Sequence, residues 1–144
     1  MARYWIYLFR DEVADGYYQR PEKIIELLQE YQTASLKSIC HKQIQFITER
    51  ISFSRLELGM KQHFSGQIEK NVERNMLVLK DEKTSEEALI IAQQRRLFLI
   101  SDSQPLTNRI FQALAMISSS FLAVDIHFHH YQWLTMATEE RKFA

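Results

Sequence analysis

The sequence is poor in cysteine, glycine and proline, with one Cys, three Gly and two Pro in 144 residues. A single cysteine cannot form a disulfide within the chain, and a lone thiol fits a reducing compartment. Because glycine and proline are scarce and no Ser/Gly/Pro-rich stretch occurs, the sequence offers no linker. With 46% hydrophobic residues, we expect residues 1–144 to form a single domain around its own core.

The sequence also lacks a long apolar run and an excess of one charge, and these two absences exclude classes of function. The N-terminal apolar run covers only Tyr4–Phe9, which is too short for a signal peptide and far short of the ~20 residues of a membrane span. Eighteen basic residues balance eighteen acidic ones, and neither half of the chain carries a basic arm that would attract polyanions. We therefore expect a cytoplasmic protein that inserts into no membrane and binds no nucleic acid directly.

Hydrophobic periodicity predicts most of the helices. Apolar residues recur every three or four positions in 21–32, 35–51, 53–64 and 105–117, which is typical of amphipathic helices. Ser35 can cap the second of these. Acidic residues at the start of 11–18 favour a further short helix there.

Five short apolar runs predict strands, at 4–9, 75–80, 88–93, 97–101 and 121–128. The first is apolar on both faces, which is typical of an interior strand with Trp5 or Tyr7 buried. Polar turns between the middle three indicate an antiparallel meander. The order β-α-α-α-β-β-β-α-β predicts an α+β fold, α/β by a looser naming, with helices packed on a single mixed sheet of about five strands.

The histidines of the predicted last strand are candidates for a metal site. His127 and His129 share a strand face with Asp125, and imidazole and carboxylate ligands suit Zn²⁺ or another transition metal. The alternative is a solvated face of an edge strand, with the apolar neighbours of these residues facing the core. The regular alternation of polar and apolar residues favours the solvated face.

Cys40 and His41 are the other candidates for chemistry, as a thiolate with an adjacent base. However, neighbours on a helix point about 100° apart, and Cys40 falls inside the apolar arc, which favours a buried, inert thiol. The sequence has no phosphate loop, nucleophile elbow or suitably placed carboxylate pair. An enzyme therefore has no positive support, and we expect no cofactor and no small-molecule substrate.

Two stripes of residues are candidates for a protein interface. Val13 and Tyr17 lie four apart in the short helix, and Gln43, Phe46 and Arg50 recur at helical spacing beside the apolar arc of 35–51. A mixed aromatic, amide and guanidinium stripe is typical of interface hot spots. Ordinary packing or a solvated flank explains most such stripes.

Several segments, in order and over the whole length, resemble a known family. They are the aromatic first strand followed by D-E-V-A-D-G-Y-Y (11–18), then K-Q-I-Q-F-I-T (42–48), F-L-A-V-D (121–125), Y-Q-W-L (131–134) and the closing E-R-K-F-A (140–144). The chain is similar to the sporulation inhibitor of replication family, SirA, of endospore-forming bacteria. This resemblance implies a non-enzymatic inhibitor that binds domain I of the replication initiator DnaA during sporulation and blocks its action at the chromosome origin.

The resemblance also implies contact residues for DnaA, at Val13, Tyr17, Gln43 and Phe46. Val13 stands where the family pattern has Phe, and Phe46 where it has Tyr, so aromatic contact area and a hydroxyl are lost. If the chain is such an inhibitor, these four residues must converge on one exposed patch. The alternative function is a small metal-dependent or thiol enzyme that uses the histidine or cysteine candidates above.

Overall fold

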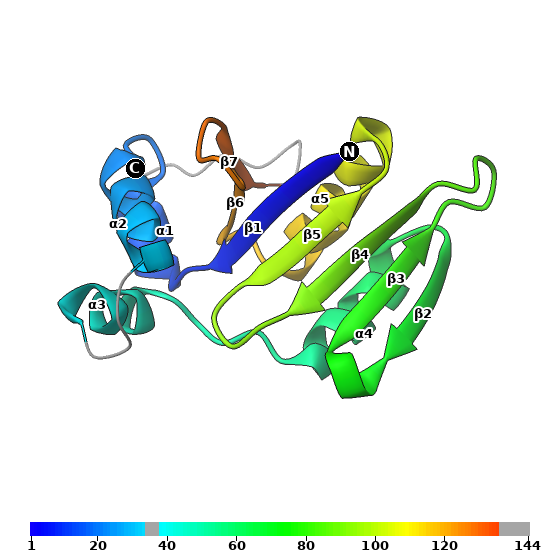
Figure 1. Ribbon diagram of the computed structural model, residues 1–144, viewed down its shortest axis with the longest axis horizontal. Coiled ribbons are helices and arrows are strands. Elements are labelled where there is room, and N and C mark those ends of the chain that lie inside the picture. Colours follow the sequence, from blue (N-terminus) through cyan, green and yellow to red (C-terminus); the bar gives the residue numbers. More distant parts are fainter. Residues whose placement is uncertain (34–37, 136–144) are drawn as a thin grey trace.

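The computed structural model describes residues 1–33 and 38–135. Within these ranges, seven strands form one sheet that is accompanied by five α-helices and one short 3₁₀ turn (Figure 1). In chain order the elements are β1 (Ala2–Leu8), α1 (Asp11–Tyr17), α2 (Glu22–Thr33), α3 (Ile39–Ile47), α4 (Phe53–His63), β2 (Gln67–Asn71), η1 (Val72–Arg74), β3 (Met76–Lys80), β4 (Glu87–Ala92), β5 (Leu97–Ser101), α5 (Gln104–Ile117), β6 (Phe121–Asp125) and β7 (Tyr131–Leu134).

The sheet has the strand order β2-β3-β4-β5-β1-β6-β7, and every neighbouring pair is antiparallel. The α+β class is confirmed, as is the interior position of the first strand, where Tyr7 is fully buried. The expectation of a mixed sheet is wrong, because the chain joins its strands without the parallel crossovers that a mixed sheet needs. No helix within the described ranges combines the length and apolar character needed to cross a membrane.

The prediction of about five strands is wrong because it missed the two edge strands. β2 contributes one apolar side chain, Ile68, to the core. β7 has four residues, and two of them, Tyr131 and Gln132, are exposed. An edge strand needs little apolar surface, so neither segment has the hydrophobic pattern of a strand.

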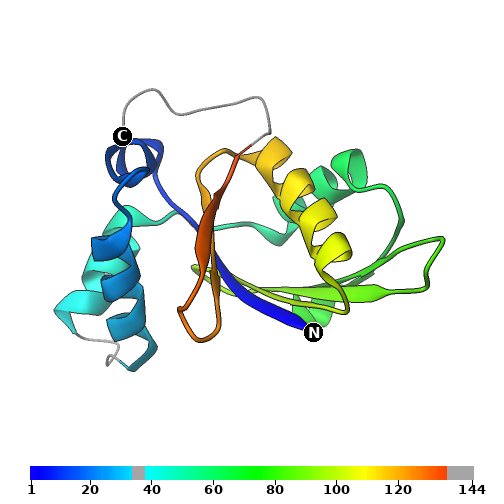
Figure 2. The same ribbon diagram turned by 90° about the horizontal axis from the view of Figure 1, so that it is seen from above.

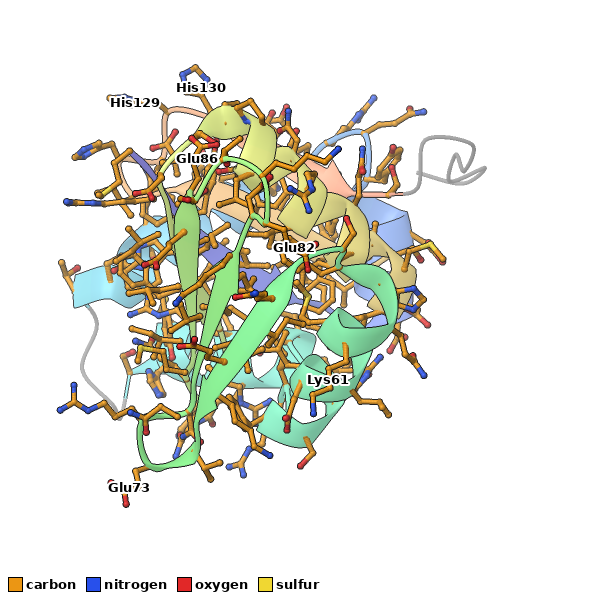
Figure 3. All side chains as sticks on the ribbon, turned by 90° about the vertical axis from the view of Figure 1, so that its right-hand side faces the viewer. Lys61, Glu73, Glu82, Glu86, His129 and His130 are labelled. Carbon is orange, nitrogen blue, oxygen red and sulfur yellow. The ribbon has the colours of Figure 1, made fainter. Side chains whose placement is uncertain are left out.

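The histidine segment is a turn, and the prediction of a strand over 121–128 is wrong in its second half. β6 ends at Asp125, whose carboxylate accepts hydrogen bonds from the backbone N–H groups of His127, His129 and His130. Phe128 takes a left-handed backbone conformation with φ of 59°, which breaks the strand alternation. The histidines therefore share no strand face with Asp125, and Figure 3 shows His129 and His130 projecting at the outside of the molecule.

The Asp125 carboxylate gives the β6–β7 turn a pH-dependent stability. Partial burial raises the pKa of this carboxyl, but the three backbone N–H groups outweigh burial and lower the pKa below its usual value. A carboxyl with a lowered folded-state pKa stabilises the fold above the unfolded-state pKa of about 3.9, and this contribution is lost as the pH falls through the folded-state pKa.

We expect Asp125→Asn to lower the free energy of unfolding by about 1–2 kcal/mol at pH 7, because the charged acceptor is lost. The difference from the wild type should shrink at pH 3 and below. Urea unfolding at both pH values measures it. An equal loss at the two pH values would contradict the role of the charge.

The helices cover the sheet unevenly. Figure 2 shows α4 and α5 on one side of the sheet and α1–α3 gathered at one end of it. α4 and α5 pack on the face that carries Ile6 and Leu8 of β1, together with the buried residues of β3–β5. On the other face, α1–α3 form a second cluster with Tyr7 and Phe9, next to Leu122 of β6. We refer to α1–α3 as the helical lobe.

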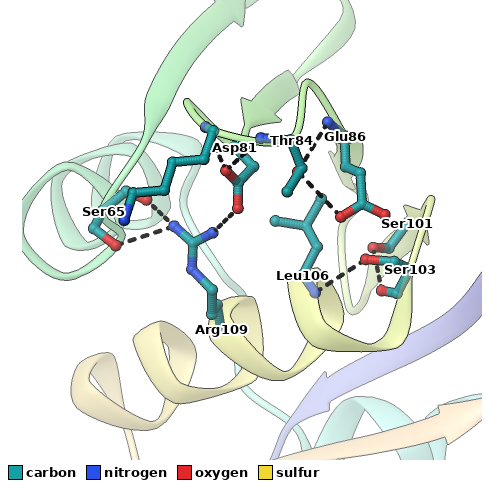
Figure 4. Close-up of polar contacts among 9 residues, drawn as sticks. Ser65, Asp81, Thr84, Glu86, Ser101, Ser103, Leu106 and Arg109 are labelled. Carbon is teal, nitrogen blue, oxygen red and sulfur yellow. Dashed lines mark hydrogen bonds and ion pairs between the residues drawn. The ribbon is translucent and has the colours of Figure 1, made fainter.

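Polar contacts fix α5 to the loops around it (Figure 4). Arg109 of α5 contacts the carboxylate of Asp81 and both the carbonyl and hydroxyl oxygens of Ser65. The pKa of the Asp81 carboxyl is lowered by hydrogen bonds from the backbone N–H groups of the turn after β3, with a smaller contribution from Arg109. The Ser103 hydroxyl accepts from the N–H of Leu106 and caps the start of the helix.

The turn between β4 and β5 fixes the helical lobe to the sheet. The guanidinium carbon of Arg96 lies 3.7 Å from the ring centre of Trp5 in β1 and 5.8 Å from that of Tyr31 in α2, and Arg96 donates to the hydroxyl of Tyr7 at 3.3 Å. Arg95 donates to the carbonyl oxygen of Thr48, at the end of the lobe, at 3.1 Å. These contacts hold the lobe in one position relative to β1.

Candidate functional site

A groove of about 610 Å³ lies across the helical lobe. Its lining residues come from all three helices and are Val13, Tyr17, Lys23, Ile24, Leu27, Ile39, Lys42, Gln43, Phe46 and Ile47. All four residues singled out from the sequence, Val13, Tyr17, Gln43 and Phe46, are among them. The structure therefore brings these residues onto one surface, and their role in binding stays a prediction.

The first wall of the groove is α1. Ala14 is fully buried and packs this short helix against the core, and the Ser120 hydroxyl donates to the Asp11 carboxylate at its start. Val13 and Tyr17 lie one helical turn apart and both line the groove. Val13 is half-buried, whereas 40% of Tyr17 is exposed.

The opposite wall is α3, which Ser38 caps by accepting from the N–H of His41. Cys40 and Ile44 are buried on its inner face, while Gln43 and Phe46 are exposed. Ser35, the predicted cap, lies outside the described residues.

The predicted helix over 35–51 is too long. Thr48 has extended backbone and forms an isolated β-bridge with Phe9, and the N–H of Arg10 donates to the carbonyl oxygen of Ile47. These tertiary contacts end α3 at Ile47. Arg50 therefore lies beyond the helix and does not continue the stripe of Gln43 and Phe46.

Phe46 is the most prominent aromatic residue of the groove, because 69% of it is exposed. The guanidinium carbon of Arg10 lies 5.0 Å from its ring centre, a cation–π distance. Contiguous exposed apolar surface is typical of interaction sites. Phe46 and Tyr17, on opposite walls, are the two aromatic side chains that the groove presents.

The rim of the groove is cationic, although the chain as a whole is neutral. Lys23 of α2 and Lys42 of α3 are exposed and line it, and the apolar floor includes Ile24 and Leu27. Sequence reasoning missed the two lysines and also Ile39, 76% of which is exposed. No local pattern places them together, since Lys23 and Lys42 meet only when α2 packs against α3.

Cys40 is buried, as predicted, and its environment is that of an inert thiol. Its Sγ lies 3.5 Å from the carbonyl oxygen of Leu27, and burial and then the charge of Glu30 raise the pKa of the thiol. The neighbouring His41 ring stacks on Tyr31, with ring centres 5.0 Å apart. This geometry does not favour a nucleophile and its base.

We expect Cys40 to react slowly with a thiol reagent such as Ellman's reagent in the native protein, because both burial and the raised pKa keep it from forming a thiolate at neutral pH. Labelling should become fast in denaturant. Rapid labelling of the native protein would restore the thiol-enzyme alternative.

The histidine candidates do not form the predicted metal-site geometry with Asp125. The carboxylate of Asp125 accepts hydrogen bonds from the backbone N–H groups of the turn instead. In the part of the chain that the structure describes, no three His, Cys, Asp or Glu side chains are placed to hold a metal ion.

Comparison with known proteins agrees with the resemblance noted in the sequence. The family model for the "Sporulation inhibitor of replication protein SirA" matches residues 2–138. A curated relative of the same name from Bacillus subtilis (strain 168) is 24% identical over 145 residues, which is 98% of this chain and 97% of the relative. Both matches span the sheet and the helices that form the groove. The chain therefore belongs to the sporulation inhibitor of replication (SirA) family.

Proposed function

We propose that residues 1–144 act as a single-domain, non-enzymatic inhibitor of replication initiation, which binds domain I of DnaA in the groove of the helical lobe. The proposal is supported by membership of the SirA family, together with one observation. The four residues expected to contact DnaA, which come from separate segments, line the same groove. The proposed place of action is the cytoplasm, which holds the chromosome.

The groove suits recognition of a protein surface by a few anchors. Tyr17 and Phe46 offer exposed aromatic surface on opposite walls, and the apolar floor between them excludes water once a partner is seated. Gln43 adds an amide that can both donate and accept hydrogen bonds. Inhibition then follows from occupancy, because a covered surface of domain I cannot make the contacts that DnaA needs at the origin.

The lysines on the rim indicate which charge the surface of a binding partner should carry. Lys23 and Lys42 favour apolar side chains flanked by acidic ones, since complementary charges speed association and select partners. Exposed charges are screened by salt over about 8 Å at physiological ionic strength. Binding should therefore weaken as the salt concentration rises.

Calorimetric titration of the purified chain with isolated DnaA domain I tests the proposal. We expect saturable binding with one site per chain and a dissociation constant that rises between low and physiological salt. DnaA that lacks domain I is the control and should not bind. Absence of binding to domain I, or equal binding to the truncated DnaA, would overturn the proposal.

A further inference from the structure

The sheet face opposite α4 and α5 is uncovered over β3, β4 and β5, and it is apolar except at one end, where Lys80 and Glu87 form an ion pair at 3.6 Å. Figure 1 looks onto this face, with α4 and α5 behind it and the helical lobe to one side. Six apolar side chains on alternate strand positions point away from α4 and α5 and are only half-buried; they are Met76, Val78, Leu89, Ile91, Phe98 and Ile100. We call these residues, with Arg3, Trp5, Glu69 and Asn71 at the two sides, the open face.

This composition is unusual for a sheet face in water. An antiparallel sheet with one solvated face usually alternates apolar residues inside with polar residues outside. In β4, by contrast, Ala88 and Ile90 are buried against the helices, while Leu89 and Ile91 on the other face are apolar as well. A contiguous apolar surface of this kind marks an interaction site.

The strand register arranges the open face in two rows that run across the sheet. One row is Arg3, Ile100, Leu89, Val78 and Glu69, from β1 to β2. The second row is Trp5, Phe98, Ile91, Met76 and Asn71. β4 is the middle strand of both rows. At β1 the rows end in the basic Arg3 and the bulky Trp5, and at β2 they end in the acidic Glu69 and the smaller Asn71.

We propose that the open face is the interface of a symmetric dimer of this chain, with the two-fold axis parallel to β4. Such an axis reverses each row on the second copy, so that Arg3 lies over Glu69 of the second copy and Leu89 over its own equivalent. A two-fold interface must be self-complementary in this way. Bulky side chains of one copy also lie over smaller ones of the second copy, since Phe98 lies over Met76. Sheets commonly pack face to face with nearly aligned strands, as this axis requires.

The size of the face indicates a weak dimer. Five strands spaced by about 4.8 Å and five residues rising by about 3.4 Å span roughly 24 by 17 Å, or about 400 Å² in projection. A standard interface buries about 800 Å² per partner. The dimer should therefore form in the micromolar to millimolar range.

Dimerisation is independent of the proposed binding of DnaA. The open face and the groove share no residue, so each dimer presents two grooves. A variant that fails to dimerise should keep its affinity for DnaA domain I. Loss of binding at the groove would likewise leave the dimer intact.

Sedimentation equilibrium of the wild type from about 1 µM to about 1 mM, the range set by the interface size, measures the association. We expect the mass to rise from 17.2 kDa towards twice that value and not beyond it. Leu89→Glu should raise the dissociation constant at least tenfold, because two charges would face each other across the axis. The matched control is Leu58→Glu on α4, where 60% of the leucine is exposed away from the open face, and it should dimerise as the wild type does.

Charge reversal tests the symmetry itself, using Arg3→Glu and Glu69→Arg. Each variant alone places like charges over one another twice and should dimerise less than the wild type. A mixture of the two should form a heterodimer with both pairs restored. Because Glu69 also contacts Lys80 at 3.2 Å within its own chain, circular dichroism must show that both variants are folded.

Three results would overturn the proposal. The first is a monomer throughout the concentration range, and the second is a mass that grows past the dimer without a plateau. The third is folded charge variants that associate no better when mixed than when separate.

Discussion

Replacing Tyr17 or Phe46 with alanine should weaken binding to DnaA domain I by about 2 kcal/mol or more, which is about 30-fold. Each side chain is largely exposed in the free chain, with 40% of Tyr17 and 69% of Phe46 accessible, and each lines the groove. Truncation therefore removes contact area from the complex while costing the free protein little. Calorimetric titration of each variant, with circular dichroism to show that it is folded, gives the loss directly.

The structure offers a matched control for Tyr17. Tyr131 is exposed to nearly the same extent, 43%, but it lies on β7 rather than on the helical lobe. Tyr131→Ala and His127→Ala should both leave the affinity unchanged. Wild-type affinity in both Tyr17→Ala and Phe46→Ala would show that the groove is not the binding surface, even if DnaA is the partner.

Phe9→Ala should lower the free energy of unfolding by about 3–5 kcal/mol, the range for a large aromatic side chain in a core. Phe9 is fully buried where the sheet meets the helical lobe, and its ring centre lies 5.8 Å from that of Trp133. Its N–H donates to the carbonyl oxygen of Ser120, and it forms the β-bridge with Thr48 that ends α3. Urea denaturation followed by circular dichroism measures the loss.

The same substitution at the surface provides the comparison. Phe46→Ala removes an equal side chain from an exposed position, where the contact with Arg10 is lost, and should cost no more than about 1 kcal/mol. If Phe9→Ala lowers the free energy of unfolding as little as Phe46→Ala does, the packing of Phe9 does not hold the helical lobe to the sheet. A variant that unfolds outright agrees with the expected effect.

The elements predicted well from the sequence are those with strong local patterns. The predicted strand at 97–101 matches β5, and α5 begins within one residue of the start predicted at Pro105. The predicted helix over 35–51 extends past the end of α3, because that end depends on a contact between Thr48 and Phe9, which lie far apart in the sequence. The sequence pattern does not predict the turn at 125–130, because the hydrogen bonds of Asp125 override the alternation of polar and apolar residues.

The candidate site could be predicted only in part. Helical spacing places Val13 beside Tyr17 and Gln43 near Phe46, but whether the two pairs face each other depends on how α1 and α3 pack around α2. That packing also decides that Lys23 and Lys42 share a rim. The strands β3–β5 carry apolar residues on both faces, and the structure fully buries only one of these faces within the chain.

The central claim is that the groove of the helical lobe binds DnaA domain I. Titration of the ¹⁵N-labelled chain with unlabelled domain I, followed by amide chemical shifts, tests it most directly. We expect the largest shift changes at groove residues of α1, α2 and α3, including Tyr17, Gln43 and Phe46, with the amides of β3–β5 little affected. Changes centred on β3–β5, with the groove amides unmoved at saturation, would contradict it.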